Sequence, residues 1–103
     1  MKWIEKIVLH SANSYHHEEI RKALDQLNFT MADESLKGMS IFRRVRLDNE
    51  WVIQIKWESD SNENTLKKSS LGLQMVESLQ KLGLINHDLW VKEIDCLPKG
   101  VEI

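Results

Sequence analysis

Two histidines, His10 and His87, have the clearest potential for chemistry in this 103-residue chain. His10 ends a run of alternating apolar and polar residues that is typical of a strand, and His87 precedes the last predicted strand. If these strands are antiparallel neighbours, both histidines lie at one edge of the sheet with Trp51 and Arg46. Because histidine titrates near neutral pH, the pair could bind a ligand or transfer a proton there. The alternative, two ordinary strand-end histidines in contact with water, stays open.

Aromatic and basic side chains around His10 predict a binding pocket. We expect a substrate to be bound by Phe42, Arg44, Trp51 and Trp90.

Basic side chains are also expected on the same face of the sheet. Lys6, Arg44 and Lys56 could attract an anionic ligand to this face. Equally, they could pair with acidic residues across an interface between two copies of the chain. Composition does not separate these alternatives.

Motifs of metal, nucleotide and disulfide sites are missing from the sequence. Four scattered glycines exclude a phosphate-binding loop, and Cys96 is the only cysteine. His16 and His17 would point about 100° apart on a helix, so a solvated surface is the favoured interpretation. The segment after Asp60 opens like a calcium loop but has Thr65 where that loop needs glycine. We therefore expect neither a metal nor a cofactor.

Composition places the chain among small globular proteins. The length predicts a single domain over residues 1–103, and a hydrophobic fraction of 42% is enough for one core. A formal net charge of -2 argues against a general nucleic-acid binder. Neither a leader-like apolar stretch nor a run of about 20 apolar residues is found. We expect a cytoplasmic protein that binds neither nucleic acid nor membranes.

Hydrophobic periodicity predicts the elements in the first half of the chain. Residues 2–10 alternate as a strand with Trp3, Ile7 and Leu9 on one face, and a helix follows with its apolar stripe between Ile20 and Leu27. The long loop 28–38 is either packed on the core or a lid over a site. Residues 39–47 and 51–57 form the clearest hairpin.

The hairpin register depends on its loop. With residues 48–50 as a three-residue loop, the apolar side chains of both strands share one face, and Arg43 is the exception. A two-residue loop would mix apolar and charged side chains, so the longer loop is favoured.

The second half of the chain predicts one helix and one strand. The helix spans about 70–82, with Met75 and Leu79 in its apolar stripe. Gly72 lies on the same side, which would permit a close approach to the sheet. Gly83 is placed to end this helix in a left-handed cap. Residues 86–88 then turn the chain into a last strand, 89–94.

The order strand, helix, strand, strand, helix, strand predicts a ferredoxin-like α+β fold with antiparallel sheet order 4-1-3-2. Two helices of this size can cover only one face of the sheet. The other face would carry apolar residues among charged ones, and such a surface rarely stays bare. We expect a homodimer through these sheet faces or, alternatively, a small aromatic ligand.

The run from Ile53 to Ser59, Ile-Gln-Ile-Lys-Trp-Glu-Ser, leads through a polar turn into the second helix. With the chain length and element order, it resembles the third strand of the antibiotic biosynthesis monooxygenase-like group of dimeric α+β barrels. The resemblance implies a closed dimeric barrel with a pocket between sheet and helices. It also implies oxidation of aromatic or quinol substrates without a cofactor, or, in related members, haem degradation. Many members begin this helix with a histidine, but residues 64–69 contain none, so no catalytic residue is carried over.

Three functions remain in competition. The first is a small-molecule-binding dimeric barrel that acts as a cofactor-independent monooxygenase on an aromatic or quinol substrate. The second is a non-catalytic ligand-binding or assembly module, which predicts a stable dimer without turnover. The third, RNA binding on the sheet, needs a basic-aromatic strand motif, and Phe42 is a lone candidate for it.

Overall fold

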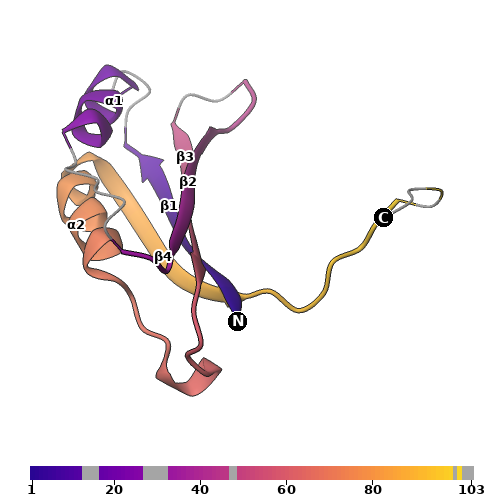
Figure 1. Ribbon diagram of the computed structural model, residues 1–103. Helices are drawn as coiled ribbons and strands as arrows, with labels where there is room; N and C mark the ends of the chain where they lie inside the picture. The colour runs from indigo at the N-terminus through magenta and orange to yellow at the C-terminus, as the bar shows by residue number, and fades with distance from the viewer. Residues whose placement is uncertain (13–16, 27–32, 47–48, 99, 101–103) are drawn as a thin grey trace.

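Four strands form one antiparallel sheet, and two helices pack on one of its faces (Figure 1). The computed structural model of the chain describes residues 1–12, 17–26, 33–46, 49–98 and 100, with His17 as backbone only. In chain order the elements are β1 (Lys2–Ser11), α1 (His17–Asp25), β2 (Leu36–Arg43), β3 (Glu50–Glu58), the 3-10 helix η2 (Glu63–Thr65), α2 (Ser70–Leu79), the 3-10 helix η3 (Gln80–Leu82) and β4 (Gly83–Val91). The strand order β2-β3-β1-β4 is the predicted order 4-1-3-2 read from the other edge, so the ferredoxin-like α+β fold is confirmed.

Side-chain alternation along β1 divides the sheet into two faces. Trp3, Ile7 and Leu9 point toward the helices and are buried, as the sequence predicts. Glu5 occupies the inward position between Trp3 and Ile7, and it is fully buried as well. A carboxylate therefore lies in the core layer, which the apolar pattern did not predict.

The core lies between the sheet and the two helices. Its buried apolar residues are Trp3, Ile7, Leu9, Ile20, Leu36, Trp51, Ile53, Ile55, Trp57, Met75, Leu79 and Leu82. The helix stripes that the sequence predicts are confirmed at Ile20 in α1 and at Met75 and Leu79 in α2. Burying a large apolar side chain stabilises a fold by roughly 1.5–3 kcal/mol, so this layer holds the helices on the sheet.

The hairpin of β2 and β3 has the predicted faces but a longer connection. Strand pairing ends where Arg43 lies opposite Trp51, and the Arg44 N–H donates to the Glu50 carbonyl at 3.0 Å. The prediction of a three-residue loop at residues 48–50 is therefore wrong. Val45, expected on the apolar face, is 78% exposed because the chain has already left the sheet there.

The start of β2 also differs from the expectation. The strand begins at Leu36, which lies opposite Trp57 and is buried, so the end of the predicted loop 28–38 belongs to the sheet. Residues 28–32 of that loop, and Leu27 of the predicted helix stripe, lie outside the described residues. His16 and the side chain of His17 also lie outside them.

The last strand begins earlier than predicted. β4 starts at Gly83, so the turn at 86–88 and the strand 89–94 are wrong. Gly83 does not adopt a left-handed cap: its backbone is extended, with φ 167°. It lies so close to β1 that a Cβ atom would be 2.0 Å from the carbonyl oxygen of His10. Glycine is required there for close approach, and strand pairing continues directly from the helix end.

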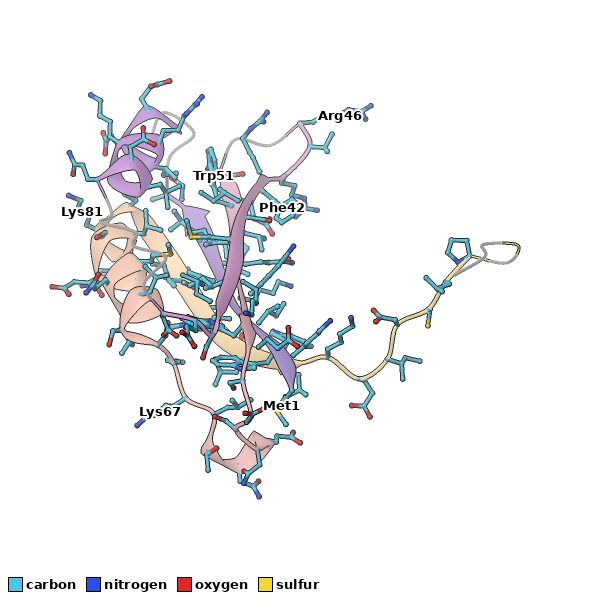
Figure 2. The ribbon with its side chains drawn as sticks, viewed as in Figure 1. Met1, Phe42, Arg46, Trp51, Lys67 and Lys81 are labelled. Carbon is cyan, nitrogen blue, oxygen red and sulfur yellow. The ribbon has the colours of Figure 1, made fainter. Side chains whose placement is uncertain are left out.

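The sheet face opposite the helices, here called the open face, carries the predicted mixture of apolar and charged side chains. Phe42 points away from the helices, whereas Lys67 and Lys81 lie on the helix side of the molecule (Figure 2). The open-face apolar residues are Ile4, Val8, Phe42, Val52, Leu84 and Trp90. After β4, the segment 92–98 extends away from the sheet (Figure 1). Within the described residues, no helix has the length and apolar character needed to cross a membrane.

Candidate functional site

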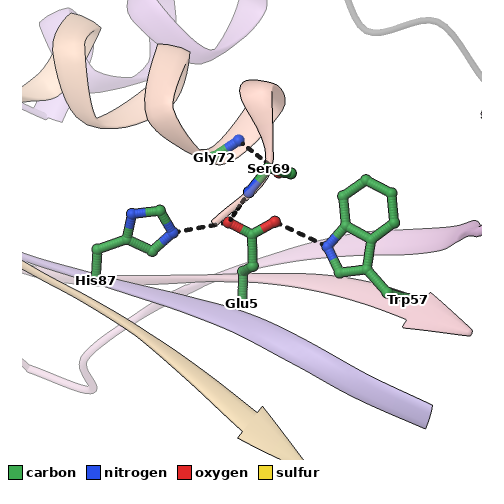
Figure 3. A network of polar contacts seen from close by, with 5 residues as sticks. All are labelled: Glu5, Trp57, Ser69, Gly72 and His87. Carbon is green, nitrogen blue, oxygen red and sulfur yellow. Dashed lines mark hydrogen bonds and ion pairs between the residues drawn. The ribbon is translucent and has the colours of Figure 1, made fainter. Parts of the chain in front are cut away.

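The buried carboxylate of Glu5 is the centre of a polar network between the sheet and α2 (Figure 3). Its Oε2 atom lies 2.7 Å from Nε2 of His87 on β4. The backbone N–H of Ser69 donates to the same oxygen at 3.2 Å. The indole Nε1–H of Trp57 on β3 donates to Oε1 at 2.9 Å. One side chain on β1 thus joins two neighbouring strands to the start of a helix.

The surroundings of Glu5 explain how a carboxylate can be buried. Removing a charged group from water is costly unless hydrogen bonds compensate, and three donors converge here. Ser69 is the N-cap of α2, and its Oγ accepts a hydrogen bond from the Gly72 N–H at 3.0 Å. The N-terminal end of a helix carries partial positive charge, which favours a carboxylate at this place. No fully buried side-chain nitrogen or oxygen of the described residues lacks a hydrogen-bond partner.

Gly72 allows α2 to approach the carboxylate. A Cβ atom at this position would lie 2.1 Å from Glu5 Oε2 and 3.0 Å from Cε1 of His87. The close approach to the sheet predicted for Gly72 is therefore confirmed, and the group that it approaches is polar. We refer to Glu5, Trp57, Ser69, Gly72 and His87 as the Glu5 network.

The imidazole of His87 contacts Glu5 through one of its two ring nitrogens, Nε2. When the carboxylate is ionised it only accepts hydrogen bonds, so Nε2 of His87 then donates to it and a neutral ring has its lone pair on Nδ1. No hydrogen bond from a described residue reaches Nδ1. The side chain is 6% exposed. In the catalytic sites of some enzymes, a carboxylate orients a histidine through one ring nitrogen while the other nitrogen acts as the general base. Glu5 and His87 have this arrangement.

The structure separates the two predicted catalytic histidines. His10 lies opposite Glu50 and Leu84 on the open face, and its side chain is 47% exposed. His87 lies opposite Ile7 on the helix-covered face. The prediction that both meet at one edge is wrong, because β4 begins at Gly83 and His87 lies within the strand instead of before it.

The predicted substrate-binding residues lie in three places. Phe42 and Arg44 lie at the His10 end of the open face, and Trp90 lies opposite Ile4, toward the other end. Trp51 belongs to the buried core. These positions do not form a single pocket, and substrate binding by each of them stays a prediction.

Arg44 makes an ion pair near His10. Its Nη1 donates to Glu50 Oε2 at 2.8 Å, and His10 Nδ1 lies 3.9 Å from the same oxygen. The hydrogen bond from Arg44 lowers the pKa of the Glu50 carboxyl from its ordinary value, against a smaller opposing effect of desolvation. The charges of Arg44 and His10 add to the lowering.

We expect the Arg44→Gln substitution to raise the pKa of Glu50 toward the ordinary value of a glutamate. Because the folded-state pKa is lowered, the stabilisation from this pair is complete above the ordinary pKa and is lost as pH falls through the lowered one. A ¹³C NMR titration of the Glu50 carboxyl measures the midpoint. The Arg21→Gln variant is the control, and an equal displacement in both variants would contradict the assignment.

Three members of the Glu5 network were missed by sequence reasoning: Glu5, Trp57 as a polar donor, and Ser69. The available signal for Glu5 was its charge at an inward position between Trp3 and Ile7. Ser69, three residues before Gly72, has the spacing of an N-cap. Among the described residues, no three histidine, cysteine, aspartate or glutamate side chains come together as metal ligands would.

A small pocket adjoins the network. Its volume is about 200 Å³, and it is lined by Trp3, Asp33, Ser35, Trp57, Ser59, Ser61 and Ser69. The indole rings of Trp3 and Trp57 stack with their centroids 5.6 Å apart and their planes at 17°. Trp57 and Ser69 thus contact both this pocket and the carboxylate of Glu5.

Solved structures share this fold at low sequence identity. A protein from Deinococcus radiodurans that is provisionally named an antibiotic biosynthesis monooxygenase is 13% identical, with a TM-score of 0.65 over 97% of this chain and 100% of that one. A provisionally named antibiotic biosynthesis monooxygenase from Nitrosomonas europaea is 6% identical, with a TM-score of 0.63 over 87% of this chain and 97% of that one. SnoaB, a cofactor-independent oxygenase from Streptomyces nogalater, is 17% identical, with a TM-score of 0.55 over 95% of this chain and 96% of that one.

Sequence comparison alone gives no assignment. No protein-family model matches the chain, and no curated protein is significantly similar to it. The likeness to the solved structures is one of fold, and it agrees with the resemblance of the run from Ile53 to Ser59. This chain therefore has the α+β fold of the antibiotic biosynthesis monooxygenase-like structures.

Proposed function

We propose that this protein is a cofactor-independent monooxygenase that acts on a small electron-rich aromatic or quinol molecule, with His87 as its base. The contact of 2.7 Å between His87 Nε2 and Glu5 Oε2 carries the proposal. The fold supports it, since SnoaB, which shares the fold, is named a cofactor-independent oxygenase.

The chemistry needs a base that is oriented and shielded. When Nδ1 of His87 takes the proton of a phenol or quinol hydroxyl, the resulting anion donates electrons to dioxygen and forms a peroxide at a ring carbon. The imidazolium returns the proton to this peroxide, and loss of water leaves one oxygen atom on the substrate as a carbonyl. Glu5 stabilises the imidazolium that forms between these two steps. The small exposed fraction of His87 keeps bulk water from the reacting anion. Glu5 is a positioning residue in this proposal, because it acts on the substrate only through His87.

Oxygen uptake with a panel of quinols and anthrones tests the proposal. We expect the His87→Gln variant to lose about 100-fold in turnover, the size of a general-base contribution. The His10→Gln variant is the matched control, and its activity should stay within about twofold, because His10 lies on the opposite face. Anaerobic absorption spectra separate proton abstraction from oxygen chemistry, since only an intact base should produce the substrate anion.

A non-catalytic role is the second candidate, and the satisfied hydrogen bonds of Glu5 favour it. A carboxylate with three donors also serves as a structural link between β1, β3, β4 and α2. In that case no quinol or anthrone increases oxygen uptake, and the only effect of His87→Gln is a lower thermal stability. Thermal melts of both histidine variants, run beside the uptake assay, separate the two functions.

We also propose that the protein forms a homodimer in which the open faces of two copies pack together. An apolar patch on this face, formed by Val8, Phe42, Val52 and Leu84, supports this arrangement. Phe42 is 52% exposed and Leu84 is 77% exposed, which is unusual for large apolar side chains in such a cluster. Sedimentation equilibrium measures the association, and Phe42→Lys should shift the protein to monomers.

A further inference from the structure

A hollow lies at the other end of the open face, where β1 begins and β4 ends. Gly38, Lys56, Ile4 and Trp90 occupy opposing positions on successive strands and form a row across the whole sheet. Gly38 has no side chain, and a Cβ atom there would meet nothing within 4 Å, so the row is open beside Lys56. The hollow has a volume of about 520 Å³, which lies in the range of small-molecule pockets.

The floor of the hollow is apolar and partly aromatic. Ile4 is half-buried, and Trp90 next to it is 55% exposed. The ammonium group of Lys6 lies 5.6 Å from the centre of the Trp90 ring, so the indole already attracts a cation on the open face. A flat apolar molecule could cover Ile4 and the exposed part of the indole.

The rim of the hollow is basic on a chain whose formal net charge is -2. Its charged residues are Lys2, Lys37, Lys56, Glu58 and Lys92. Lys92 pairs with Asp95 at 2.5 Å. In the described part of the chain, neither Lys37 nor Lys56 has an ion-pair partner. Two lysines without an ion pair among the described residues thus lie beside an apolar floor, and Glu58 is the one carboxylate among the residues that line the hollow.

We propose that this hollow binds a small molecule with a flat, aromatic body and one anionic group, such as a carboxylate. The body packs on Ile4 and Trp90, and the anion lies between Lys37 and Lys56. Trp57 of the Glu5 network also lines this hollow, but Glu5 and His87, the residues of the proposed reaction, do not. The hollow is separate from the apolar patch around Val8, since four strand residues span roughly 13 Å. The inference is therefore independent of the proposed reaction.

Equilibrium dialysis with 2-naphthoate and its neutral analogue 2-naphthamide tests the proposal. We expect 2-naphthoate to bind saturably, with one molecule per chain, and the amide to bind at least about tenfold more weakly, since it lacks the charge. The Lys56→Gln and Lys37→Gln variants should each weaken 2-naphthoate binding about fivefold, the size of an ion pair near a surface. Added salt should weaken the binding of 2-naphthoate to the wild-type protein and leave the binding of 2-naphthamide unchanged.

The Lys81→Gln variant is the matched control, because it removes the same charge on the helix side of the molecule (Figure 2). Equal binding of the acid and the amide, or equal losses in Lys56→Gln and Lys81→Gln, would overturn the proposal. The alternative occupant of the hollow is a second copy of the chain, and sedimentation of the same variants tests for it. Weaker self-association of Lys56→Gln, together with no binding of 2-naphthoate to the wild type, would assign the hollow to a contact between two copies.

Discussion

Replacing Glu5 with alanine is expected to lower the free energy of unfolding by about 3–5 kcal/mol, because three donors lose their acceptor at about 1–3 kcal/mol each and the removal of a buried charge offsets part of this loss. The substitution leaves the Trp57 indole N–H, the Ser69 backbone N–H and the His87 ring without their acceptor. The Trp57 donor is buried and the Ser69 and His87 donors are partly buried, so water replaces the lost hydrogen bonds only in part. Guanidinium unfolding followed by tryptophan fluorescence measures the change.

Two further variants show whether the loss comes from the network. Glu5→Gln keeps the side-chain shape and one acceptor oxygen, but its amide N–H₂ faces the Ser69 N–H, so we expect an intermediate loss of about 1–3 kcal/mol. Glu77→Ala, on the exposed side of α2, controls for the removal of a negative charge and should change stability by less than about 0.5 kcal/mol. A Glu5→Ala protein as stable as the Glu77→Ala protein would show that the hydrogen bonds contribute nothing.

Replacing Gly72 with alanine is expected to destabilise the protein by about 1–3 kcal/mol, although alanine normally stabilises a helix relative to glycine. The added Cβ atom would lie 2.1 Å from Glu5 Oε2. The carboxylate cannot rotate away cheaply, because His87, Trp57 and Ser69 hold both of its oxygens. Denaturant unfolding measures the loss, with Gln74→Ala, at an exposed position of the same helix, as the control.

The same substitution in a Glu5→Ala background separates this clash from other effects. Without the carboxylate, the Cβ atom at position 72 loses its nearest obstacle, so Gly72→Ala should cost much less and could recover about 0.5–1 kcal/mol of helix propensity. The two substitutions should therefore be coupled in a double-mutant cycle. Additive effects would mean that α2 does not depend on the carboxylate for its position.

Local patterns in the sequence were sufficient for the buried faces of the sheet, but not for all of its strand bounds. The alternation around Ile7, the apolar faces of the hairpin and the stripe through Met75 each predicted the buried side correctly. These signals are strong because a one-residue shift of register would expose a whole apolar face to water. The strand order followed from the chain order and the handedness of the crossovers.

The network and the start of β4 could not be read from local patterns. Asn86, His87 and Asp88 are polar and resemble a turn, and the strand is formed there by pairing with β1, whose partner positions Ile7 and Val8 are far away in the chain. Glu5 likewise meets His87 across a separation of 82 residues. Tertiary contacts of this kind override local propensity. The extended backbone of Gly83 has the same cause, since its close contact is the carbonyl of His10 on β1.

The position of β1 between β3 and β4 has a consequence for biosynthesis. Of the four strands, β1 leaves the ribosome first, yet both strands that flank it are made in the later part of the chain. Its carboxylate at Glu5 must remain hydrated until Trp57, Ser69 and His87 have been synthesised. Closing such distant pairs is slow compared with forming local ones. Burial of the Glu5 side chain is therefore a late step of folding, which takes place when β1 pairs with β4.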